Sequence, residues 1–162
     1  MNDPRPTEEG PVRVVSYLTD RPDLVKLVMG GVVDKSDSTT EGYALVLRWL
    51  SHADDESTMF YWGTETLGTR VLHRLRWAKD PDVFVSWPQY PKQPCRLLPR
   101  QPGFFFAPEI KAKPWFIALT DPDRRPMAFD VTASNSRDMT PILMWPRNDG
   151  DNQIWRIEPV KS

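Results

Sequence analysis

Hydrophobic residues occur along this chain in short bursts, separated by clusters of Pro, Asp, Ser and Gly. The bursts are rich in Val, Ile, Leu and aromatic residues, which is typical of β-strands. One burst, 67–77, also repeats apolar residues at helical spacing, but its β-branched and aromatic content favours a strand. The pattern therefore predicts an all-β protein with strands at 12–18, 24–29, 43–50, 59–64, 70–78, 83–87, 95–98, 103–107, 115–119, 127–131, 142–145 and 153–157.

Twelve strands divide into three groups of four, which suggests an internal repeat of about 54 residues. The first and last thirds of the chain share the same order of features. A tryptophan ends the third strand (Trp49 and Trp145), and a polar loop and an aromatic fourth strand follow. The middle third keeps the strands but lacks these tryptophans. We expect a single domain over 1–162, with repeats at 11–64, 65–110 and 111–160 and a flexible tail at 1–10.

Composition narrows the class of protein. The 17 prolines among 162 residues are roughly twice the average share of about 5% and argue against a mainly helical fold. Lys and Arg number 21 against 22 Asp and Glu, a net charge of -1, so neither a nucleic-acid partner nor membrane insertion is expected. The polar N-terminus and the lack of a long apolar run predict a cytoplasmic protein.

The chain offers little for catalysis or metal binding. Cys95 is the single cysteine, so no disulfide can form within the chain, and with His52 and His73 it cannot supply a usual structural zinc site. No third orienting group accompanies Cys95, so a cysteine hydrolase is not indicated. We expect no cofactor, no metal and no enzymatic activity.

The segment 129–157 carries an ordered set of motifs. Asp130 lies in an apolar-Asp-Val strand, Trp145 ends a Pro-x-x-x-Trp strand, and a short Asn/Asp/Gly loop leads to Asn152-Gln153-Ile154-Trp155. This set resembles one subdomain of the ricin B chain type lectins, which carry a Gln-x-Trp motif. The resemblance implies a β-trefoil of twelve short strands in three pseudo-symmetric repeats.

The resemblance also implies roles for individual residues. Asp130 is similar to the carboxylate that accepts hydrogen bonds from sugar hydroxyls, Trp145 to the aromatic platform, and Asn152 to an amide that contacts another hydroxyl. Gln153 is similar to the neighbour that orients the aspartate. One position departs from the pattern, because Leu143 stands where many members have glutamine on the third strand.

Sugar chemistry leads to the same residues. A pyranose has one apolar C–H face and a rim of hydroxyls, so a binder needs an aromatic surface with fixed donors and acceptors. An Asp, a Trp and an Asn-Gln pair on neighbouring strands supply these groups. In the first third Leu27 stands in place of the aspartate. The sequence thus predicts a non-enzymatic binder of a glycan or glycoprotein with at most one family-type site, and its oligomeric state stays open.

A second hypothesis comes from the proline-rich stretch 86–95. Prolines around Trp87 and Tyr90 hold an aromatic loop in an extended shape. Such a loop loses little entropy when it docks. By analogy of fold alone, this chain could instead be a protease inhibitor, or another protein-binding trefoil that acts through this surface loop.

Overall fold

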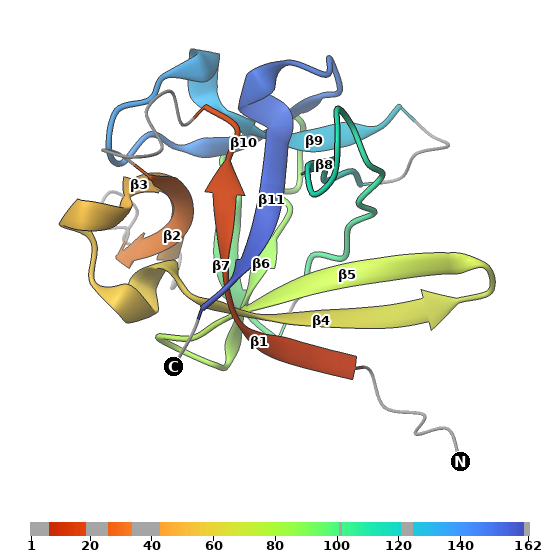
Figure 1. Ribbon diagram of the computed structural model, residues 1–162, viewed down its shortest axis with the longest axis horizontal. Coiled ribbons are helices and arrows are strands. Elements are labelled where there is room, and N and C mark those ends of the chain that lie inside the picture. The colour runs from red at the N-terminus through yellow and green to blue at the C-terminus, as the bar shows by residue number, and fades with distance from the viewer. Residues whose placement is uncertain (1–6, 19–25, 34–42, 101, 121–124, 161–162) are drawn as a thin grey trace.

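The computed structural model describes residues 7–18, 26–33, 43–100, 102–120 and 125–160. This part of the chain contains no α-helix (Figure 1). It consists of eleven strands and four short 3-10 helices: β1 (Thr7–Ser16), β2 (Leu27–Val33), β3 (Tyr43–Trp49), η1 (Leu50–His52), η2 (Asp55–Thr58), β4 (Phe60–Leu67), β5 (Arg70–Trp77), β6 (Val83–Ser86), β7 (Arg96–Pro99), β8 (Phe116–Ile117), β9 (Met127–Val131), η3 (Thr132–Ser134), β10 (Ile142–Pro146), η4 (Asp151–Gln153) and β11 (Ile154–Pro159).

Seven strands form a closed barrel in the order β2-β3-β7-β6-β5-β4-β1, which a pairing of β1 with β2 closes. Val15 and Val28 are the partners at this closure. Strand β11 pairs with β1, and β8 continues from β11. Strands β9 and β10 form a separate antiparallel hairpin, which lies at the top of Figure 1, away from the long β4–β5 hairpin.

Eleven of the predicted segments overlap with strands, although several bounds differ, and one does not. The predicted strand 103–107 appears only as isolated bridges, in which Phe105 pairs with His73 and Phe106 pairs with Leu119. Because these two adjacent residues pair with different neighbours, neither pairing extends into a ladder, and the prolines at 102 and 108 remove backbone donors on either side. The prediction of twelve strands is therefore corrected to eleven in the described part of the chain.

Two other predicted boundaries fall at the edges of the described chain. Strand β1 begins at Thr7, which pairs with Thr64 of β4, inside the segment that the sequence predicts as a tail. Residues 1–6 of that tail lie outside the described residues, as do residues 24 and 25 of the strand predicted at 24–29.

The core fills the barrel and the space beneath the hairpins. Its largest fully buried side chains include Trp77, Trp155, Phe60 and Phe129. The backbone approaches closely at Gly31, where a Cβ would lie 2.6 Å from a ring carbon of Trp77, so only glycine leaves room for this indole. The core thus anchors both the barrel and the β9–β10 hairpin.

No helix in the described chain is long and apolar enough to cross a membrane.

Candidate functional site

The β9–β10 hairpin has one core face and one outward face. Asp130 lies opposite Leu143, and Trp145 lies opposite Ala128. Side chains alternate along a strand, and directly paired residues share a face, so these four residues lie on the face turned away from the main core cluster, called the outward face below. Ala128 on this face is fully buried in a second small cluster with Ile117 and Leu119. The intervening residues, Phe129, Val131, Ile142 and Met144, belong to the core cluster. The hairpin thus places the predicted carboxylate and the predicted aromatic platform on the same surface.

The Asp130 carboxylate lies deep in this surface and is only 4% exposed. Its Oδ2 accepts a hydrogen bond of 2.8 Å from Nε2 of Gln153. Burial raises the pKa of Asp130, while hydrogen bonds from Gln153 and Asn152 oppose the rise. A carboxylate held in this way is a preorganised acceptor, since its position is fixed before any ligand arrives.

Gln153 is fully buried and connects three pieces of the site. Its Nε2 also donates to the carbonyl of Pro146 at 2.9 Å, and its Oε1 accepts from the backbone N–H of Asn148 at 2.9 Å. Both amide hydrogens are therefore used within the protein. Gln153 positions Asp130 and the 147–150 loop and has no donor left for a ligand.

Asn152 lies beside Asp130 on the short helix η4. Its Nδ2 donates to the carbonyl of Val131 at 3.0 Å, and its side chain is half-buried. The structure therefore brings Asp130, Asn152 and Gln153 together, as the sequence predicts. Trp155, which follows them on β11, is fully buried and donates to the Phe129 carbonyl at 3.2 Å.

Trp145 is half-buried, and the Lys92 ammonium lies over its ring at 5.2 Å from the ring centroid. Lys92 comes from the proline-rich stretch, which runs beside β10: its N–H donates to the Met144 carbonyl at 2.6 Å, and the Met144 N–H donates to the Gln93 carbonyl at 3.0 Å. Sequence reasoning missed Lys92. No local signal indicates it, because the contact joins residues more than fifty positions apart.

The two aromatic residues of the alternative loop differ in environment. Trp87 stacks on Phe129 with ring centroids 4.0 Å apart and an interplanar angle of 9°, and its Nε1 donates to the Phe104 carbonyl at 3.0 Å. Tyr90, by contrast, is 58% exposed. The structure therefore directs Trp87 toward the core and leaves Tyr90 as the accessible aromatic of this loop.

Cys95 is the cysteine considered above as a nucleophile. Cys95 is fully buried, and burial raises the pKa of its thiol well above the ordinary value, with the Asp130 charge adding to the rise. A thiol in this state is a poor nucleophile. In the described ranges no group of three His, Cys, Asp or Glu side chains could hold a metal ion.

Solved structures with a similar fold were found, although no protein-family model matches the sequence and no curated protein sequence matches it. A designed threefold-symmetric protein, ThreeFoil, has a TM-score of 0.66 at 13% identity, covering 94% of this chain and 100% of that chain. The Macrolepiota procera ricin B-like lectin, solved with lactose, has a TM-score of 0.64 at 14% identity, covering 94% of this chain and 97% of that one.

The C-half of an earthworm R-type lectin, solved with GalNAc, has a TM-score of 0.56 at 15% identity. The match covers 92% of this chain and 98% of that chain. At such low identities these likenesses show the fold alone: an all-β architecture of the kind found in ricin B-like lectins, in agreement with the β-trefoil type that the sequence resemblance implies.

Proposed function

We propose that this chain is a non-enzymatic carbohydrate-binding protein whose single family-type site lies on the β9–β10 hairpin. Asp130 accepts hydrogen bonds from sugar hydroxyls, Trp145 supports the apolar face of the ring, and Asn152 contacts a further hydroxyl. Gln153 positions the aspartate. The partner is a glycan or a glycoprotein, and the site belongs to the third of three trefoil repeats.

The observation that carries this proposal is the buried hydrogen bond from Gln153 to Asp130, on the hairpin face that also presents Trp145. Burying a carboxylate costs free energy unless it is well paired, and this one has hydrogen-bonding amides but no partner of opposite charge among the described residues. A ligand hydroxyl that donates to Asp130 offsets part of that cost. The Lys92 ammonium covers one face of the same indole, so the sugar ring packs on the opposite face of Trp145.

A glycan array with the wild-type chain and Asp130→Asn tests the proposal. The substitution keeps the shape of the side chain and removes its charge. Asp151→Asn is the matched control, because Asp151 is exposed in the same segment and its carboxylate pairs with Lys111 at 3.7 Å. We expect a defined set of glycans to bind the wild type and the control, and the signal to be lost with Asp130→Asn.

Two results would favour other conclusions. An array without any bound glycan contradicts the proposal. Inhibition of a serine or cysteine protease that disappears with Tyr90→Ala supports the alternative, a protein-binding trefoil acting through its loop. Trp87→Ala would be a poor probe of that alternative, because Trp87 packs on Phe129 and its loss would also disturb the core.

A further inference from the structure

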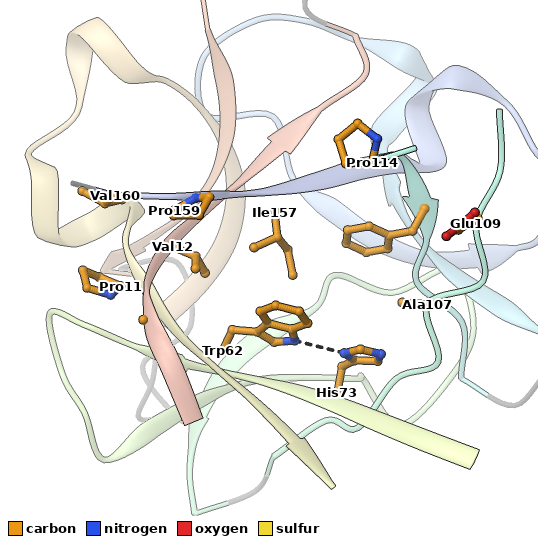
Figure 2. A pocket seen from close by; sticks show the side chains of 12 residues that line it. Pro11, Val12, Trp62, His73, Ala107, Glu109, Pro114, Ile157, Pro159 and Val160 are labelled. Atoms are coloured by element: carbon orange, nitrogen blue, oxygen red, sulfur yellow. Dashed lines mark hydrogen bonds between the residues drawn. The ribbon is translucent and has the colours of Figure 1, made fainter. Parts of the chain in front are cut away.

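A cavity with a volume of about 440 Å³ lies away from the β9–β10 hairpin. It opens between β1, β4, β5, β11 and the segment 107–116, and Figure 2 shows its side chains. None of its lining residues belongs to the candidate sugar site. Most of the lining is apolar and includes Val12, Trp62, Ala107, Pro114, Phe116 and Ile157. A cavity of this volume is within the usual range for small-molecule sites, about 300–1,000 Å³.

His73 places one oriented donor at this cavity. Trp62 Nε1–H donates to Nδ1 of His73 at 3.0 Å (Figure 2). Nδ1 must therefore be the acceptor nitrogen, and the neutral ring carries its hydrogen on Nε2. Burial lowers the pKa of His73 and favours this neutral form.

The neighbouring rings fix the direction of this donor. The hydrogen bond holds the His73 ring edge to edge with Trp62, with the two planes 12° apart, and the Phe105 ring centroid lies 5.5 Å away at an interplanar angle of 23°. Nε2 lies on the side of the ring away from Trp62, toward Ala107 (Figure 2), and finds no hydrogen-bond acceptor in the described part of the chain. The cavity thus presents an N–H group that is aligned and available.

The charge of the lining indicates a neutral ligand. Glu109 is the one acidic residue among those that line the cavity, and its carboxylate is 3.5 Å from the Lys113 ammonium, both side chains being exposed. A carboxylate at the rim disfavours an anion, and a single donor among apolar walls cannot replace the water around the many hydroxyls of a sugar.

We propose that this cavity binds a small neutral aromatic molecule that carries one hydrogen-bond acceptor, such as an aryl ketone. The aromatic ring packs between the walls formed by Trp62, Phe116 and Ile157, and the acceptor receives the hydrogen bond from His73 Nε2. This site is independent of the proposed sugar site, because the two share no residue.

Two probes of similar shape test the proposal: acetophenone, which has a carbonyl acceptor, and isopropylbenzene, which has none. Binding of each is measured by ligand-observed NMR, together with the indole N–H resonance of Trp62. The chain is used as wild type, as His73→Phe, which keeps an aromatic ring but removes both the Nε2 donor and the Nδ1 acceptor of the Trp62 N–H, and as Ala107→Leu, which fills the cavity. Ala112→Leu is the matched control, because Ala112 is exposed and does not line the cavity.

We expect both probes to bind the wild type and the Ala112→Leu control and to shift the Trp62 resonance. His73→Phe should weaken the binding of acetophenone by roughly three- to tenfold, the usual effect of one hydrogen bond. The affinity for isopropylbenzene should stay unchanged. Retained isopropylbenzene binding also shows that this variant is folded. Ala107→Leu should abolish both. No binding by the wild type, an equal effect of His73→Phe on both probes, or unchanged binding by Ala107→Leu would each overturn the proposal.

Discussion

At the residue scale, two aspartates of this chain have opposite electrostatic environments. Burial raises the pKa of Asp130 above its ordinary value of 3.8. Burial also acts on Asp138, but hydrogen bonds from the Trp49 N–H at 2.9 Å and from Arg48 Nε at 3.0 Å outweigh it and lower its pKa. The charge of Asp130 therefore lowers the stability of the folded state, whereas the charge of Asp138 raises it.

The pH dependence of unfolding should differ in sign between these two positions. Because the pKa of Asp130 is raised in the folded state, its stabilising contribution is present in acid and is lost as the pH rises from 3.8 through the raised value. Asp138, with a lowered pKa, contributes stability above pH 3.8 that is lost as the pH falls.

Urea unfolding of Asp130→Asn and Asp138→Asn at several pH values measures this difference. Relative to wild type, Asp130→Asn should gain stability as the pH rises, and Asp138→Asn should lose it. Each variant serves as the control for the other, since both replace one aspartate by asparagine. Parallel slopes for the two variants would contradict the environments described.

At the element scale, Gln153 connects the hairpin to the strand that follows it. It bonds Asp130 on β9, the Pro146 carbonyl at the end of β10 and the Asn148 N–H in the next loop. A hydrogen bond to a charged group contributes about 1.5–3 kcal/mol. The hairpin forms its own two-stranded sheet, so these side-chain bonds supplement its limited backbone pairing.

Gln153→Ala should lower the free energy of unfolding by about 2–3 kcal/mol, because it leaves the Asp130 carboxylate buried without its principal donor. Equilibrium denaturation of Gln153→Ala, Asp130→Ala and the double variant forms a double-mutant cycle. We expect the double variant to lose clearly less than the sum of the two single losses. Strict additivity would mean that the two side chains do not stabilise each other.

Element geometry also explains which parts of the site the sequence could predict. Asp130, Asn152 and Gln153 lie within one hairpin and its next turn, so their order along the chain was enough to bring them together. Strand 103–107 and Lys92 depend on partners far along the chain: Phe105 and Phe106 pair with different segments, and Lys92 reaches Trp145 through a loop from the middle of the sequence. Local pattern contains no signal for either.

Trp49 and Trp145 occupy equivalent positions in the sequence pattern, but the pattern does not show which face of its strand each tryptophan occupies. On β3 the core residues are Leu45 and Leu47, so Trp49, two positions later, lies on the core side and packs against that cluster. On β10 the core residues are Ile142 and Met144, which places Trp145 on the outward side. A shift of one position relative to the core reverses the face of a strand residue. The two tryptophans are therefore similar in sequence position and both half-buried, but they lie on opposite faces of their strands relative to the core.

At the scale of the whole molecule, the three hairpins β2–β3, β6–β7 and β9–β10 present different outward faces. On β2–β3 this face carries Val28, Gly30, Val46 and Arg48, and on β6–β7 it carries Phe84, Ser86, Arg96 and Leu98. Val28, Gly30, Val46 and Ser86 among them are buried. Neither set includes a carboxylate, whereas β9–β10 presents Asp130. Of these three hairpins, β9–β10 alone therefore carries the carboxylate that the proposed sugar site uses.

This asymmetry predicts one sugar per chain. Calorimetric titration with a glycan that the array identifies should give a stoichiometry of one, and Asp130→Asn should remove the heat of binding entirely. Avidity arises from linking several sites. A multivalent display of that glycan should therefore bind a single chain with nearly the same affinity per sugar as the free glycan. A stoichiometry of two or three, or residual binding by Asp130→Asn, would place further sites on the outward faces that lack a carboxylate. Substitutions in the β2–β3 hairpin, which carries Arg48, and in the β6–β7 hairpin, which carries Arg96, would then be the first to examine.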